Sequence, residues 1–207
     1  MPKLSSRLRR VSPDAPKGFR LPFPVTSKVR FAQLGVGPRF EGIKPFRAER
    51  LVELEGFRPQ VIVGQATDLQ LVAEQVELGM LDLSSVDHAL IVVTHCGLEP
   101  VTDVARVVLW QTFGVPVFEI FTSLDYTVLA SECELHEGWH LEADVQLDFL
   151  QGELLLNTHG NSGLRTGMTG RIDEEPCPCG RSTPRVMNVR PATAAFENSR
   201  PDLAAIA

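Results

Sequence analysis

The fold is decided by residues 88–121, which read HALIVVTHCGLEPVTDVARVVLWQTFGVPVFEIF. Its first part, His88 to Thr94, contains the uninterrupted apolar run Ala89 to Val93, which predicts a strand buried on both faces. Thr102 or Asp103 then provides the N-cap of a helix, because a side-chain oxygen there can accept a hydrogen bond from the first turn. Val115 to Phe121 follows as another strand. Buried strands joined by a helix predict a parallel sheet in an α/β layer.

The same alternation extends toward the N-terminus, and a different one begins after Phe121. Helical spacing of apolar residues and short apolar runs predict helix, strand and helix at Phe46–Glu55, Gln60–Val63 and Leu69–Leu78. After Phe121 the apolar period becomes two, which predicts short antiparallel strands at Val128–Cys133, Trp139–Leu141, Val145–Leu150 and Glu153–Asn157. We therefore expect an α/β protein in which a partial parallel-sheet subdomain, residues 46–126, precedes a small antiparallel β subdomain, residues 127–187.

The two ends of the chain differ from this middle part in composition. Through Arg50 the 207-residue sequence has 12 Lys and Arg against 3 Asp and Glu, and afterwards 8 against 23. Residues 1–45 are basic and rich in Pro and Gly, which predicts irregular chain, and residues 188–207 form an Ala- and Pro-rich tail. The basic segment lacks the interleaved aromatic residues of nucleic-acid binders, so we expect it to contact the acidic remainder or a protein partner instead.

Overall composition restricts the class of protein. Apolar residues make up 43% of the sequence and charged residues 22%, which excludes wholesale disorder, and the longest apolar runs are too short for a membrane span. The N-terminus has no apolar core of a secretory signal, so we expect a cytoplasmic protein without a membrane partner.

The sharpest chemical signal is a group of thiol and imidazole side chains. Cys133 and His140 flank a predicted hairpin turn, and Cys177 and Cys179 follow about forty residues later on either side of a proline. Three cysteines and one histidine form a normal ligand set for structural zinc, which would fasten the end of the β subdomain to its start. His136 is an alternative to His140, because a Cys-x2-His spacing also suits zinc. The remaining Cys96 is expected to be a small buried residue.

With these residues in view, the stretch from about Arg47 to Val186 resembles the phenylacetate-CoA ligase family of adenylate-forming enzymes. The resemblance lies in the order and spacing of several short motifs. These are Phe57 to Gly64, Gly97-Leu98-Glu99-Pro100, Glu132-Cys133, Gly138-Trp139-His140, Gly152-Glu153-Leu154, Arg165-Thr166-Gly167 and Pro176 to Arg181. For family members with these cysteines, the resemblance implies a zinc ion bound by Cys133, His140, Cys177 and Cys179.

The sequence departs from that family where adenylation chemistry is expected. The family's Tyr-Gly-x-Thr-Glu motif is replaced by Phe121 to Asp125, and Met168 stands where the resemblance predicts a ribose-binding Asp. No Ser/Thr/Gly-rich phosphate loop occurs, and no lysine follows Lys44. We therefore expect the phosphate loop and the C-terminal catalytic domain to be missing. No catalytic residue is assigned, and binding of AMP, ATP or CoA is not the leading expectation.

Three side chains are candidates for a surviving ligand site. Asp125 ends a predicted strand, where open α/β sheets bind ligands, and Ser123 belongs to the same motif; the alternative role of Asp125 is a helix or turn cap. Arg165 is interpreted as a ligand contact or as a hairpin charge. Residues 160–170 contain four glycines, which indicate either a phosphate cradle or turns that need positive φ.

The sequence thus predicts a zinc-stabilised, catalytically inactive relative of phenylacetate-CoA ligase that binds a small ligand or a partner, either another protein or a second copy of itself. The alternative is one subunit of a split acid-CoA ligase, in which another chain supplies the phosphate loop and the catalytic lysine.

Overall fold

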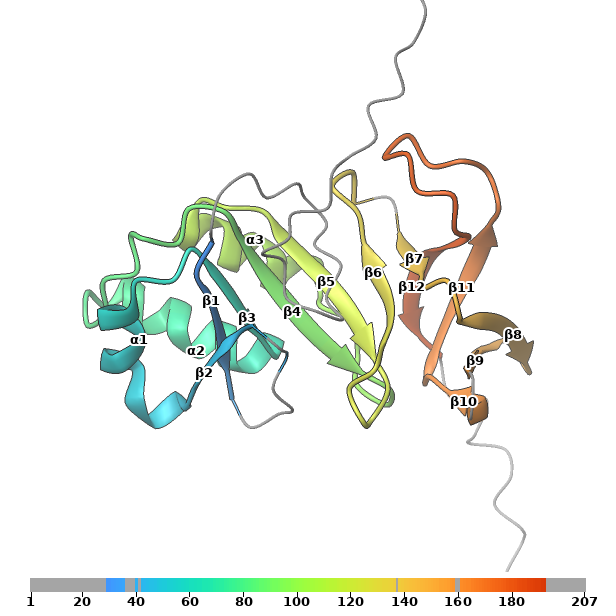
Figure 1. Cartoon of the computed structure of the whole chain (residues 1–207), viewed down its shortest axis with the longest axis horizontal. Helices are drawn as coiled ribbons and strands as arrows, with labels where there is room; N and C mark the ends of the chain where they lie inside the picture. Colours follow the sequence, from blue (N-terminus) through green and yellow to red (C-terminus); the bar gives the residue numbers. More distant parts are fainter. Residues whose placement is uncertain (1–28, 36–39, 41, 137, 159–160, 193–207) are drawn as a thin grey trace, which may run out of the picture.

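The computed structural model describes residues 29–35, 40, 42–136, 138–158 and 161–192. These residues form a nine-stranded mixed sheet with helices, followed at one end by a separate three-stranded antiparallel sheet (Figure 1). The predicted α/β class is therefore confirmed. Among these residues, no helix combines the length and the apolar character that are needed to span a bilayer.

One half of the large sheet is parallel. Its strands are β1 (Phe31–Leu34), β2 (Lys44–Phe46), β3 (Val61–Gly64), β4 (Ala89–His95) and β5 (Val117–Thr122). The connecting helices are η1 (Ala48–Arg50), α1 (Leu51–Phe57), α2 (Ala66–Glu77) and α3 (Asp103–Phe113). The spatial order β2-β1-β3-β4-β5 means that every helical crossover advances in the same direction across the sheet. Because such crossovers are almost always right-handed, the three α-helices are expected on one face.

The apolar core reflects this arrangement. Alternate residues of β3 and β4, such as Ile62 and Leu90, are fully buried in one cluster with Leu54, Leu69 and Leu109 of the three helices. The intervening residues point to the opposite face and form a second cluster, which contains Val61, Val63, Ile91, Val93 and Ile120. Burial on both faces explains the continuous apolar runs in the sequence.

The other half of the large sheet is antiparallel. It consists of β6 (Val128–Glu132), β7 (Trp139–Leu141), β12 (Arg185–Pro191) and β11 (Met168–Asp173), which continue from β5 in that order. The small sheet contains β8 (Gln146–Leu150), β9 (Glu153–Thr158) and β10 (Asn161–Arg165). Most antiparallel strands therefore extend the parallel sheet, whereas the sequence suggested a β unit that simply follows it.

Three further strands differ from the sequence prediction. β1 and the first two residues of β2 lie in the segment 1–45 that was expected to be irregular, the last residue of β2, Phe46, was expected to begin a helix, and β12 continues into the predicted tail. β1 is only four residues long, although all four are buried, and β2 contains Pro45, which an edge strand tolerates because one side needs no backbone donor. Residues 1–28, 36–39 and 41 of the basic segment and residues 193–207 of the tail lie outside the described residues.

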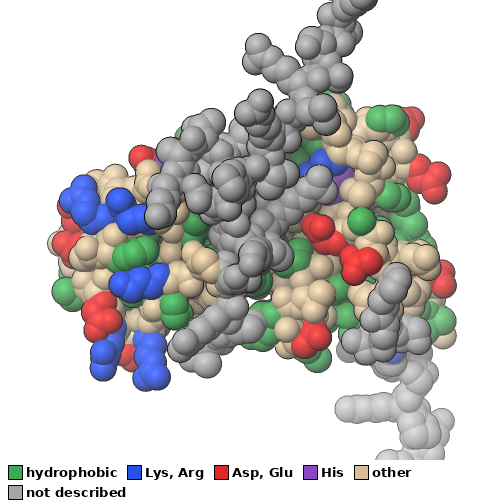
Figure 2. Space-filling model, in the orientation of Figure 1, with side chains coloured by type: hydrophobic (Ala, Val, Ile, Leu, Met, Phe, Trp, Pro, Cys, Tyr) green, Lys and Arg blue, Asp and Glu red, His purple; other side chains and the backbone are tan. Residues whose placement is uncertain are grey.

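The charge asymmetry of the sequence is visible on the surface. On the face drawn in Figure 2, Lys and Arg side chains gather mainly over the end of the molecule formed by β2 and α1.

Candidate functional site

The four predicted metal ligands converge from three parts of the antiparallel half. Cys133 follows β6, His140 is the central residue of β7, and Cys177 and Cys179 lie between β11 and β12. β7 pairs with β6 on one side and with β12 on the other, through Ser131↔His140 and Arg185↔His140. This register brings the two cysteine-bearing segments to the two sides of His140.

The geometry of the cluster suits a tetrahedral metal ion. One donor atom from each of Cys133, His140, Cys177 and Cys179 lies within 4.8 Å of the others, and all four residues are buried. Cys133 Sγ is 3.9 Å from Cys177 Sγ, and Cys179 Sγ is 3.5 Å from His140 Nε2. A tetrahedral zinc ion has sulfur–sulfur edges of about 3.8 Å and sulfur–nitrogen edges of about 3.6 Å, given its usual bond lengths. These two edges match a tetrahedral shell, so the cluster could hold a metal ion.

Hydrogen bonds with groups around the cluster orient its metal-ligand atoms. His140 Nδ1 lies 3.3 Å from the carbonyl oxygen of Thr183, so the ring can donate there and direct Nε2 at the thiols. The backbone N–H of Arg181 donates to Cys179 Sγ over 3.5 Å, and Gly180 has a φ of 82° that allows this tight turn. Burial raises the pKa of the Cys179 thiol to about 11, so a nearby positive charge is needed to stabilise its thiolate at neutral pH.

His136, the alternative ligand, is engaged elsewhere. Its ring stacks on Phe118 with a centroid distance of 4.7 Å, and its Nδ1 lies 3.7 Å from Glu132 Oε2. His136 also has a φ of 52°, in the left-handed backbone region that residues other than glycine rarely adopt. The structure thus groups His140, and not His136, with the three thiols.

A buried ionic network that the sequence did not reveal lies beside this centre. Arg106 of α3 donates to both carboxylate oxygens of Glu132, over 3.0 and 2.8 Å, and lies 3.4 Å from Glu119 Oε2. Glu119 also accepts hydrogen bonds from the Thr94 hydroxyl and, over 2.9 Å, from the Val101 N–H. Burial raises the pKa of Glu119 to about 7. The network joins α3, β4, β5 and β6, so it links the two halves of the sheet.

The candidate ligand residues Ser123, Asp125 and Arg165 are bound within the protein. Asp125 accepts hydrogen bonds from the Ser123 hydroxyl and, over 3.4 Å, from the Thr127 N–H, and the Ser123 bond is the main reason why the pKa of Asp125 is lowered. This is the turn-cap role. Arg165 pairs with Glu153, which also accepts a 2.7 Å hydrogen bond from the Gly167 N–H. The side chains of Asp125 and Arg165 remain accessible to solvent.

The segment 160–170 is mostly strand. β10 and β11 occupy much of it, and the positive φ values of Gly163 and Gly167, 69° and 75°, fit the turn interpretation. Met168 is 1% exposed and packs in the core with Phe121 and Leu154. The position at which the family resemblance predicts a ribose-binding Asp is therefore part of the hydrophobic core.

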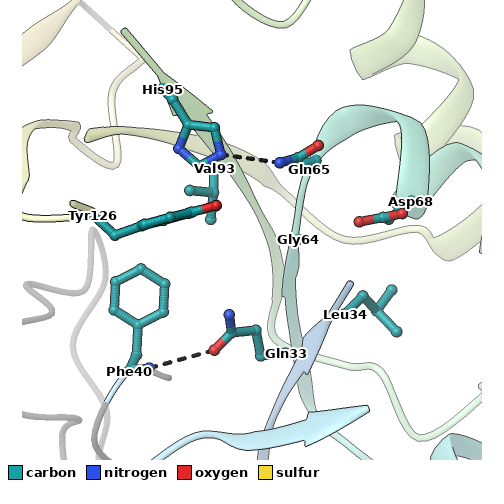
Figure 3. Close-up of a pocket in the computed structure, with 9 residues that line it drawn as sticks. All are labelled: Gln33, Leu34, Phe40, Gly64, Gln65, Asp68, Val93, His95 and Tyr126. Carbon is teal, nitrogen blue, oxygen red and sulfur yellow. Dashed lines mark hydrogen bonds between the residues drawn. The ribbon is translucent and has the colours of Figure 1, made fainter. Parts of the chain in front are cut away.

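A narrow pocket lies at the carboxyl ends of the parallel strands, where open α/β sheets commonly bind ligands (Figure 3). About 280 Å³ of empty space lies between its walls, and part of this space is open to solvent. Nine residues line it: Gln33, Leu34, Phe40, Gly64, Gln65, Asp68, Val93, His95 and Tyr126. No sequence motif pointed to this pocket, because its residues come from four separate segments and only the fold assembles them.

The polar end of the pocket is built around His95. Its Nε2 is 3.0 Å from Gln65 Nε2, which can only donate, so this ring nitrogen is the acceptor. Its Nδ1 lies 3.0 Å from Thr122 Oγ1 and carries the ring proton in this arrangement. Burial lowers the pKa of His95, which favours the neutral ring. Tyr126 packs edge-on against the imidazole at a centroid distance of 4.3 Å.

Comparison with known proteins finds similarity in structure alone. No family model matches the sequence, and no curated protein matches it. Among solved structures, 2-hydroxyisobutyryl-CoA ligase in its postadenylation state aligns with a TM-score of 0.62 at 14% identity, covering 76% of this chain and 42% of that chain. An anthranilate-CoA ligase aligns with a TM-score of 0.51 at 12% identity, covering 77% and 40%. A long-chain-fatty-acid-CoA ligase from Archaeoglobus fulgidus aligns with a TM-score of 0.50 at 13% identity, covering 75% and 43%.

These alignments extend over most of the described chain and show that its fold is similar to that of part of these ligases. The chain spans less than half the length of each of these ligases. It has the fold of a part of the adenylate-forming CoA ligases.

Proposed function

We propose that this protein is a zinc-stabilised module with the adenylate-forming ligase fold, which binds a small ligand or a protein partner and does not activate a carboxylic acid on its own. The convergence of three thiols and one imidazole within 4.8 Å carries the zinc part of the proposal. The pocket at the strand ends supports the ligand-binding part.

The donor set favours zinc in a structural role. Cys133, Cys177, Cys179 and His140 Nε2 would fill all four positions of a tetrahedral shell, which leaves none for a water or substrate. Zinc would supply the positive charge that stabilises three buried thiolates. The Thr183 carbonyl and the Arg181 N–H hold the imidazole and the Cys179 sulfur in place for it.

The surroundings of the nucleotide-related motifs support an inactive protein. Asp125 caps its own turn, Arg165 neutralises Glu153, and Met168 is buried in the core. Each of these side chains already has a structural role that leaves it poorly placed to bind a nucleotide.

Metal analysis tests the zinc proposal. The protein purified without added metal should contain about one equivalent of zinc, and Cys179→Ser should lose it because the shell is then incomplete. Cys96→Ser is the matched control, since Cys96 is also buried but lies outside the cluster, and it should keep its zinc. A folded wild-type protein without metal would contradict the proposal.

Exchange of labelled pyrophosphate into ATP tests the absence of catalysis. The chain alone, given a panel of aryl acids, should show no exchange above background. Exchange by the isolated chain would overturn this part of the proposal. Exchange that occurs only after a second protein is added would favour the split-ligase alternative.

A further inference from the structure

Asp68 is the one carboxylate among the residues that line the pocket at the strand ends. It lies in the first turn of α2, across the pocket from Phe40 and Tyr126 (Figure 3). Burial is the only influence that shifts its pKa, which is raised, and within the described part of the chain no donor or cation contacts its oxygens. A partly buried carboxylate without a partner is costly to the free protein, and a ligand that pairs with it would offset that cost.

The backbone keeps room for this carboxylate. Gly35, which follows β1, has a φ of 84°, and a Cβ atom there would collide with Asp68 Oδ2. Gln65, the N-cap of α2, makes no side-chain cap and instead bonds to His95, so the two polar side chains at this end of α2 are both directed at the pocket.

The rest of the lining determines which charge a ligand can carry. None of the nine lining residues is Lys or Arg, and His95 is neutral because of its burial and its two hydrogen bonds. A carboxylate placed here would meet the charge of Asp68 without a compensating cation. A cation would meet that charge together with the aromatic rings of Phe40 and Tyr126, which also attract cations.

We propose that this pocket binds a small protonated amine with an aromatic or other apolar body, whose ammonium group pairs with Asp68 while its body packs against Phe40 and Tyr126. This inference rests on the ligand-binding part of the proposed function. Part of the pocket's empty space of about 280 Å³ is open solvent, so only a small ligand fits, with its ammonium group between the walls and its apolar body partly exposed.

Tyr126 provides a direct report from the pocket, because it is the only tyrosine in the sequence. Zinc-loaded full-length protein with 13C-labelled tyrosine gives ring signals from this single site. Three probes of matched size are titrated at pH 7.5: phenethylamine, the uncharged 2-phenylethanol and the anionic 3-phenylpropanoate. We expect the amine to shift the Tyr126 signals and to bind at least about tenfold more tightly than the alcohol, and the acid not to bind.

Substitution of Asp68 distinguishes binding through charge pairing from binding through shape alone. Asp68→Asn should weaken amine binding at least about tenfold and leave alcohol binding unchanged. Asp103→Asn removes the corresponding acidic residue from the first turn of α3, outside the pocket, and should have no effect. Should Asp68→Asn fail to fold, Phe40→Leu tests the aromatic wall and should weaken amine binding.

Three results would overturn the inference: equal binding of the acid and the amine, binding of the acid alone, or no response of Tyr126 to the amine. None of these results affects the zinc part of the proposed function, which metal analysis tests separately. Binding of the acid alone would overturn the amine inference and leave standing the ligand-binding part of the proposed function.

Discussion

Glu119 carries a carboxyl group that the fold has almost removed from water, with 2% of the residue exposed. It shares Arg106 with Glu132, so two carboxylates face one guanidinium group. Burial and the charge of Glu132 both favour its protonated form, and the hydrogen bonds from Thr94 and Val101 only partly oppose them, which is why the pKa of Glu119 is raised to about 7.

The raised pKa predicts how stability depends on pH. Because Glu119 binds its proton more tightly in the folded state than in the unfolded state, its contribution is complete below pH 4.5 and is lost as the pH rises through 7. Relative to Glu119→Gln, which cannot titrate, the wild type should therefore lose up to about 3 kcal/mol of unfolding free energy between pH 4.5 and 8. Urea unfolding of both proteins across this range measures the difference. A constant difference would show that Glu119 ionises normally.

The sequence predicted some of the important single residues and missed others. Spacing identified three of the thiols and two histidines, but only the register of β7 between β6 and β12 distinguishes His140 from His136. Asp68 and Glu119 belong to no motif that the sequence analysis recognised. Their unusual environments arise from contacts between distant segments. The amino-acid composition and the hydrophobic periodicity of a sequence do not predict such contacts.

Among the secondary-structure elements, α3 begins and ends where its local sequence predicts. The N-cap is Thr102, one of the two residues predicted, and its hydroxyl accepts a 3.2 Å hydrogen bond from the Ala105 N–H. The helix ends at Gly114, whose φ of 68° suits a left-handed C-cap. Apolar residues at helical spacing place Ala105 and Leu109 in the core.

Removal of the cap should cost a predictable amount. Thr102→Ala leaves the Ala105 N–H without its side-chain acceptor, and we expect the free energy of unfolding to fall by about 1 kcal/mol. Thr102→Ser keeps the hydroxyl, so its free energy of unfolding should fall by less than half of that amount. Thermal and urea unfolding at fixed pH measure both variants. Equal losses for Ala and Ser would mean that the methyl group, and not the cap, stabilises this helix.

Elements without such local signals were missed. β1 is a four-residue strand in a segment rich in Gly and Pro, and it is identified only by its pairing with β2 and β3. β11 and β12 stabilise each other across a register shift between Thr169 and Arg171, which breaks the alternation that predicts strands. Long helices and buried strands can be predicted from their own residues, whereas short paired strands depend on a partner.

At the scale of the whole molecule, the sheet has two differently stabilised halves. The parallel half contains two apolar clusters, on either face of β3 and β4. In the antiparallel half, the thiols of Cys133, Cys177 and Cys179 form a small cluster of their own, next to a third apolar cluster around Phe121 and Trp139. The proposed zinc ion would act on this half alone.

Removal of the metal should therefore loosen the protein unevenly. With a strong zinc chelator at neutral pH, we expect backbone hydrogen exchange to accelerate in β6, β7 and β12, while β3 and β4 keep their protection. Mass-spectrometric hydrogen exchange measures this element by element, and chelator already saturated with zinc is the control. Uniform acceleration would mean that the metal holds the entire sheet, and no change would mean that it is not needed for folding.

The separation of the metal ligands along the chain also bears on how the protein is made. Cys133 and Cys177 are 44 residues apart, and every strand of the parallel half precedes both of them. A ribosome that has released residues 31–122 has delivered a complete parallel half, whereas Cys133 and His140 must wait for about forty more residues before their partners leave the exit tunnel. Capture of the proposed zinc ion would therefore follow synthesis of the parallel half, and a shortage of zinc would leave a nascent protein with that half assembled and the metal ligands unjoined.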